Sequence, residues 1–163
     1  MARIAHLSVI LAVAVAATGV AERADALSCV SPTVEGSFAA ADAAEARYVL
    51  AVGRVVPDPG QSVPAPTNAQ PREGATISAR LTGRTLTATG FDAPVETPLS
   101  VTLDCVGSWC ATLPVQEALY FIEQREDGLH LTEGPCPRNV LAVREGTEAR
   151  ILQCALEGCE APG

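Results

Sequence analysis

Residues 116–131, QEALYFIEQREDGLHL, decide the fold that the sequence predicts. Residues 116–124 carry apolar and aromatic side chains over the length of one strand, which is typical of a β-strand. The pair Asp127-Gly128 follows, and this dipeptide favours the tight turns that join antiparallel strands. The chain then returns through Leu129, His130 and Leu131. We therefore expect a β-hairpin here, inside a larger antiparallel sheet.

Other segments predict further strands of this sheet. Residues 48–56, YVLAVGRVV, are apolar and β-rich enough for a central strand, in which Gly53 indicates a bulge or a close approach of two backbones. Short runs of period two follow at residues 76–81, 85–88 and 99–103. The glycines of this region are spaced as turn residues: Gly83, Gly90, Gly107 and Gly128.

A loop and two helices complete the expected fold. Residues 57–74 hold five prolines among small polar residues, which predicts an exposed loop. Ser31 followed by Pro32 indicates a helix start, and Thr147 indicates a second one. The apolar face of the first helix would consist of Val34, Phe38, Ala41 and Ala44. The apolar face of the second helix would consist of Ile151, Leu152, Ala155 and Leu156, with Gly158 as its C-terminal cap. The sequence thus predicts an all-β fold, a small barrel or sandwich of five or six strands with a helix near each end.

Residues 1–26 have the pattern of an export signal peptide. Arg3 precedes an apolar run at residues 7–21, and small residues at Ala24 and Ala26 predict cleavage between Ala26 and Leu27. The run is about 15 residues long, short of the roughly 20 that cross a bilayer, so we expect no membrane anchor after cleavage. Residues 27–163 then form a single domain.

The cysteines agree with export. All six lie beyond residue 26: Cys29, Cys105, Cys110, Cys136, Cys154 and Cys159. An even number in a small exported domain predicts three disulfides and an extracytoplasmic location, either periplasmic or secreted. Zinc is the alternative, but the close pairs are spaced C-x4-C and only His130 remains beyond the signal. We expect no metal and no cofactor.

The net charge of −8 and the absence of lysine restrict the partners. Such a surface repels phosphate backbones, heparin-like polyanions and anionic membranes, so these are not expected to bind. The alternative is that the acidity only keeps an exported protein in solution.

Three segments resemble netrin-like domains, the group that includes the tissue inhibitors of metalloproteases. Residues 29–42, CVSPTVEGSFAAAD, with the strand at 48–56, resemble the opening of that family. Residues 110–122, CATLPVQEALYFI, are similar to its Cys-led segment that runs into a hydrophobic strand, and residues 130–136, HLTEGPC, to the next strand, which ends in Cys. The resemblance implies a five-stranded OB-type barrel.

The resemblance also implies a disulfide map. Cys29 matches the second Cys of the family's opening pair, whose partner corresponds to Cys136. In the family, the Cys at the position of Cys110 pairs with the first Cys of the chain. Leu27 stands at that first position here, so Cys110 needs another partner, and Cys105 is close enough in sequence to serve. Cys154 and Cys159 then remain as the third pair. Because the first Cys carries the zinc-binding terminus of the protease inhibitors, Leu27 argues against inhibition by zinc chelation.

Candidate chemistry is sparse in this sequence. His130 is expected on a strand face rather than as a catalytic base, and the carboxylate pairs Glu126-Asp127 and Glu157 with Glu160 fall on a turn and a tail. The most distinctive feature is Trp109 on the short loop between Cys105 and Cys110, where a bridge would make it a rigid binding anchor. The alternative is that Trp109 folds back and caps the barrel.

The function expected from these features is an exported, non-catalytic binding or inhibitory module that recognises an extracytoplasmic protein. Two alternatives stay open: a passive envelope protein with a structural or interaction role, and a hydrolytic enzyme. A cleft containing His130 and two carboxylates would favour the enzyme. An exposed apolar patch around Trp109 would favour the binding module over the passive protein.

Overall fold

The structure is a computed structural model that describes residues 28–64 and 73–159. The expected signal peptide, its cleavage site at Ala26 and Leu27, and residues 65–72 of the proline-rich loop lie outside the described residues. The elements are, in chain order, α1 (Val34–Asp42), β1 (Arg47–Pro57), β2 (Ala75–Thr87), β3 (Gly90–Leu103), β4 (Cys105–Val106), β5 (Trp109–Cys110), β6 (Ala118–Arg125), β7 (Gly128–Glu133), β8 (Val140–Ala142) and α2 (Thr147–Glu157).

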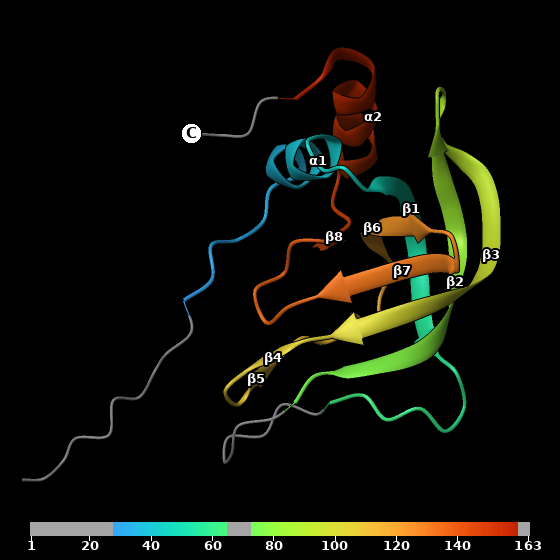
Figure 1. Ribbon diagram of the computed structural model, residues 1–163. Coiled ribbons are helices and arrows are strands. Elements are labelled where there is room, and N and C mark those ends of the chain that lie inside the picture. The colour runs from blue at the N-terminus through green and yellow to red at the C-terminus, as the bar shows by residue number, and fades with distance from the viewer. Residues whose placement is uncertain (1–27, 65–72, 160–163) are drawn as a thin grey trace, which may run out of the picture.

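Five strands close into a barrel, which confirms the expected all-β, OB-like fold with a helix near each end (Figure 1). The order around the barrel is β1-β2-β3-β7-β6, and β6 pairs again with β1. The pair β3–β7 is parallel, and the other pairs of the barrel are antiparallel. The short strand β8 extends the sheet beside β6, whereas β4 and β5 form a separate two-stranded ribbon.

The predicted hairpin is strands β6 and β7. Glu123 lies opposite His130, and Arg125 lies opposite Gly128. Gly128 has φ +136°, a conformation that residues with a side chain rarely adopt, which explains why the turn needs glycine there. The strand begins at Ala118, two residues later than its sequence suggested.

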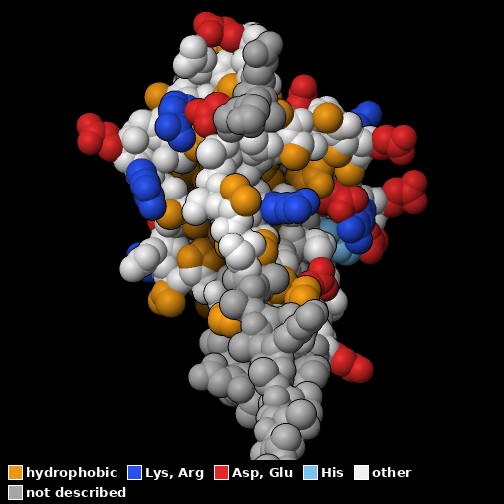
Figure 2. All heavy atoms as spheres, turned by 90° about the vertical axis from the view of Figure 1, so that its left-hand side faces the viewer, with side chains coloured by type: hydrophobic (Ala, Val, Ile, Leu, Met, Phe, Trp, Pro, Cys, Tyr) orange, Lys and Arg blue, Asp and Glu red, His pale blue; other side chains and the backbone are white. Residues whose placement is uncertain are grey.

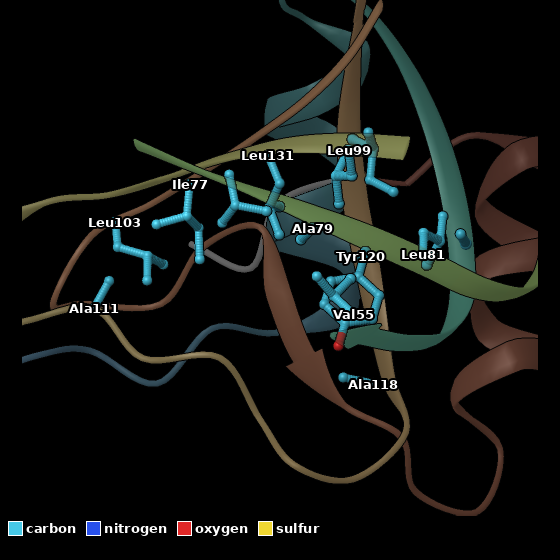
Figure 3. Close-up of a cluster of buried hydrophobic side chains, with 13 residues drawn as sticks. Val55, Ile77, Ala79, Leu81, Leu99, Leu103, Ala111, Ala118, Tyr120 and Leu131 are labelled. Atoms are coloured by element: carbon cyan, nitrogen blue, oxygen red, sulfur yellow. The ribbon is translucent and has the colours of Figure 1, made fainter. Parts of the chain in front are cut away.

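The apolar run of β6 is continuous because both of its faces are buried. Tyr120 and Ile122 point into the barrel and belong to its main core, where the Tyr120 hydroxyl lies beside Val55 (Figure 3). Leu119 and Phe121 point outward into a second core, which they share with Val34 of α1 and Ile151 of α2. The two helices therefore pack on the outside of the barrel, α1 against β1 and α2 against β3, and the core beneath them also includes residues of β6 and β8 (Figure 1).

Two glycines allow β1 and β2 to pack closely. Gly53 lies opposite Gly83 in the ladder, and a Cβ on Gly53 would lie 2.3 Å from the backbone oxygen of Thr82. The close approach predicted at Gly53 is confirmed. Gly83, in contrast, is not a turn residue, because the runs at 76–81 and 85–88 form one continuous strand that pairs with β3 along its whole length.

The helix starts differ from the predicted ones. Helix α1 is capped by Thr33, whose hydroxyl accepts a hydrogen bond from the Gly36 N–H at 3.0 Å, so Ser31 and Pro32 precede it. Helix α2 has Gly146 at its N-cap, and Thr147 is its first residue. Ala155 and Leu156 are exposed; the buried face consists of Thr147, Ile151 and Cys154.

Three disulfides staple the fold: Cys29–Cys136, Cys105–Cys110 and Cys154–Cys159. These are the pairs that the resemblance implies. The first bridge spans 107 residues of sequence and ties the segment before α1 to the loop after β7, whereas the other two each span five. Such bridges are typical of extracytoplasmic proteins.

Candidate functional site

The ribbon β4–β5 presents two apolar side chains to solvent. Cys105 pairs with Cys110, and Val106 pairs with Trp109, so the disulfide and the short ladder hold the same turn. Trp109 is 51% exposed and Val106 is 57% exposed. The base of the ribbon is fixed by the backbone hydrogen bond from Ala111 to Asp104, at 2.9 Å. The structure thus places Trp109 on a rigid projection, with half of its surface open.

A buried carboxylate organises the loop next to this ribbon. Glu133 ends β7 and is 3% exposed. Its Oε1 accepts hydrogen bonds from the backbone N–H groups of Gly134 and Arg138, and its Oε2 accepts one from Asn139, all at 2.9–3.0 Å. Burial raises the pKa of Glu133 above its ordinary value, and these hydrogen bonds oppose the rise. One side chain therefore fixes the whole turn 134–139.

The same loop is held from a second direction. The disulfide from Cys136 attaches it to Cys29, and the Ser37 hydroxyl of α1 donates a hydrogen bond to the Arg138 carbonyl at 2.8 Å. The Asp104 N–H donates to the Glu133 carbonyl at 2.9 Å, which connects the loop to the ribbon base. The loop, the segment before α1 and the ribbon therefore meet at one end of the barrel, which we call the loop end.

Three hollows open at the loop end, and each is lined partly by residues 133–139. The first, of about 250 Å³, lies between this loop, β8 and the chain from Cys110 to Ala118. The second, of about 280 Å³, lies between the loop and Val106. The third, of about 510 Å³, follows the segment from Ser28 to Thr33 and the start of α1. Figure 2 looks onto this side of the molecule and shows hydrophobic side chains and some Arg side chains among uncharged atoms, with most of the carboxylates towards the margins.

The groups considered for catalysis lie elsewhere. His130 Nε2 lies 2.9 Å from Asp127 Oδ1 on the hairpin, and Glu123 stands opposite on β6, where its hydrogen bond with Arg125 lowers its pKa. None of the three hollows is lined by His130. Glu157 accepts a hydrogen bond from Gln153 in α2, while Glu160 lies outside the described residues. The structure thus brings His130, Asp127 and Glu123 together on the hairpin, but these residues line none of the three hollows.

The described residues contain neither a cluster suited to a metal ion nor a helix suited to a membrane. Residues 28–64 and 73–159 contain no group of three or more His, Cys, Asp or Glu side chains placed to bind a metal ion. Within the same ranges, neither helix is long and apolar enough to cross a membrane.

No known protein family, no curated protein and no solved structure matches the chain. The loop end therefore has to be interpreted from its own geometry.

Glu133 and the hollows around it are functional features that the sequence did not predict. The signal was present, because a single carboxylate precedes Gly134-Pro135-Cys136-Pro137, a run that is poor in backbone donors and unable to form regular structure. An acidic residue before such a loop is suited to accept the few N–H groups that remain. The hollows themselves form from residues far apart in sequence, and no local pattern indicates them.

Proposed function

We propose that the chain is an exported, non-catalytic binding or inhibitory module of netrin-like type that recognises an extracytoplasmic protein through its loop end. The observation that carries the proposal is the meeting of two rigid, exposed pieces there: the disulfide-closed ribbon with Trp109, and the loop fixed by Glu133 and Cys136. Rigid apolar groups bind well because little conformational entropy is lost on contact. The three disulfides support export, and the resemblance supports the netrin-like assignment.

The proposal excludes one mode of inhibition. In the resembling protease inhibitors, the first Cys binds the catalytic zinc of the target, and Leu27 occupies that position here. A module that binds through Trp109 and the loop 134–139 makes no use of such a residue.

The test is partner capture with the chain that begins at Leu27, cross-linked to the envelope fraction of the exporting cell. The double variant Val106→Ser, Trp109→Ala removes the apolar pair of the ribbon. Leu156→Ala is the matched control, because Leu156 is 64% exposed on α2 and is no part of the loop end. We expect the same partner with the wild type and with the control, and a loss of about tenfold or more with the double variant, as for an aromatic hot spot.

Equal capture by all three proteins, at equal thermal stability, would mean that the ribbon is not the binding surface. If none of the three captures a specific protein, the passive envelope role replaces the binding module.

A further inference from the structure

The first hollow, which we call the Glu117 pocket, differs in chemistry from the rest of the surface. Its walls are mainly small or cyclic apolar side chains, among them Ala111, Pro114, Ala118, Pro135 and Val140. Ala111 and Ala118 are 3% and 1% exposed, so the pocket exists because the chain places small residues where larger ones would fill the space. Its volume of about 250 Å³ suits one long side chain rather than a cofactor.

The charged groups of the Glu117 pocket are both acidic. Glu117 has about half of its side chain exposed, and Glu133 is the buried acidic residue of the lining. No Arg or His belongs to the pocket lining. Arg84 approaches Glu117 to 3.8 Å from outside, but its guanidinium lies closer to Glu148, at 3.0 Å. Glu117 therefore keeps most of its capacity for a cation from solution.

The two carboxylates have unequal hydrogen bonding. Glu133 Oε1 accepts two backbone N–H groups, whereas Oε2 accepts one. The Val140 N–H also approaches the Glu133 carboxylate, so Glu133 is supplied with backbone donors and offers a ligand mainly its acidic character. An anionic ligand would be repelled by Glu117 at the opening, and a purely apolar ligand would make no use of Glu117.

We propose that the Glu117 pocket receives a lysine or arginine side chain of the partner protein, with the aliphatic stem against the apolar walls and the cationic end near the two carboxylates. The inference rests on the proposed function, because it names the residue type that the partner inserts beside the ribbon. It also uses the acidity of the chain, which attracts basic partners and repels acidic ones.

The test needs no knowledge of the partner. N-acetyl-lysine methylamide is titrated into the ¹⁵N-labelled chain that begins at Leu27, and the amide signals of Ala111, Ala118 and Ala142 are followed. The norleucine analogue is the matched probe, since it keeps the stem and lacks the ammonium group, and the glutamate analogue reverses the charge. We expect saturable shifts with the lysine probe, and affinities weaker by about threefold or more with the other two, the scale of one exposed ionic contact.

Variants assign the effect to the pocket. Glu117→Gln is expected to weaken the lysine probe by about threefold, as the loss of one exposed charge pair does. Ala142→Phe places a large ring at the pocket wall and should abolish the shifts. Glu126→Gln is the control, because it removes the same charge from the β6–β7 turn, at the far end of β6 from Ala118.

Two results would overturn the inference: no saturable shift with the lysine probe, or equal affinities for lysine and norleucine together with no effect of Glu117→Gln. Either result leaves the capture experiment untouched, because that experiment depends on Val106 and Trp109. The failure of the inference and the failure of the proposed function are therefore distinguishable.

Discussion

At the scale of single residues, two buried polar side chains differ in whether their polar atoms have hydrogen-bond partners. Glu133 is buried with three hydrogen bonds, which offset part of the cost of burying its carboxylate. The Tyr120 hydroxyl is buried in the barrel without a hydrogen-bond partner among the described residues. A weak interaction with the Val55 backbone does not reach hydrogen-bond geometry, and burial raises the pKa of Tyr120 above its ordinary value. Substitution should therefore affect the two residues differently.

Replacing Tyr120 by Phe should not destabilise the protein. The change removes an unsatisfied hydroxyl and keeps the ring, so we expect the free energy of unfolding to stay constant or to rise by up to about 1 kcal/mol. Urea denaturation of the oxidised protein measures this, and Tyr48→Phe, at the partly buried second tyrosine, is the control. A loss of more than about 1 kcal/mol would show that the hydroxyl has a partner, such as a buried water.

Replacing Glu133 by Ala should destabilise the protein by roughly 3 kcal/mol, because three backbone N–H groups lose their acceptor inside the loop end. The control Glu126→Ala lies on an exposed turn and should change stability by less than about 0.5 kcal/mol. Urea denaturation at neutral pH compares the two. Equal effects of both substitutions would contradict the role that we assign to Glu133.

The difference in unfolding free energy between the wild type and Glu133→Ala should also depend on pH. Because the folded-state pKa of Glu133 is raised, the proton-linked part of its contribution to stability is complete below the unfolded value near 4.5 and is lost as pH rises through the folded value, while its hydrogen bonds remain. The stability difference between wild type and Glu133→Ala should therefore shrink as the pH rises from 4 towards 7. A difference that grows over this range would mean that the three hydrogen bonds outweigh desolvation and lower the pKa.

At the scale of elements, the sequence predicted what depends on near neighbours. The hairpin β6–β7 follows from an apolar run, a glycine turn and a return strand, all within 16 residues, and the structure contains it. The sequence predicts two runs in place of strand β2, because the local pattern around Gly83 is typical of a turn. Glycine is needed at position 83 for a different reason: it lies opposite Gly53 of β1 and leaves room for the two backbones to approach closely. The loop end was not predicted for the same reason, because it joins residues from Ser28 to Ala142.

The long disulfide should stabilise these elements more than the ribbon disulfide does. In the chain-entropy model, the bridge across 107 residues contributes about 5 kcal/mol and the bridge across five about 2 kcal/mol. We therefore expect Cys29→Ala with Cys136→Ala to lower the unfolding free energy by more than twice as much as Cys105→Ala with Cys110→Ala. Non-reducing peptide mapping of the wild type verifies the pairs, and a peptide that joins Cys29 to another cysteine would contradict the netrin-like alignment.

At the scale of the whole molecule, charge and rigidity are distributed differently. The chain has a net charge of −8 and no lysine. The exposed apolar side chains of the disulfide-closed ribbon, Val106 and Trp109, lie at the loop end. Two of the three disulfides, Cys29–Cys136 and Cys105–Cys110, hold that end, and the third closes the C-terminal end of α2. Oxidation therefore does more than stabilise the barrel, because it fixes the surface that we propose for binding.

If the proposed binding surface depends on oxidation, export becomes a condition of the proposed function, and the sequence predicts that residues 1–26 direct this export. Small side chains at Ala24 and Ala26 fit the cleavage pattern of signal peptides, so the exported protein should begin at Leu27 with all six cysteines oxidised. Intact mass of the extracytoplasmic product, with and without reduction, measures both properties. Ala26→Phe puts a bulky ring at the cleavage site and should retain the signal segment, whereas Ala21→Val, further from that site, should be processed normally. A wild-type product that still carries Met1 would contradict the predicted cleavage. A product that contains free thiols would place the folded chain in a reducing compartment, where the loop end would lose both of its disulfides.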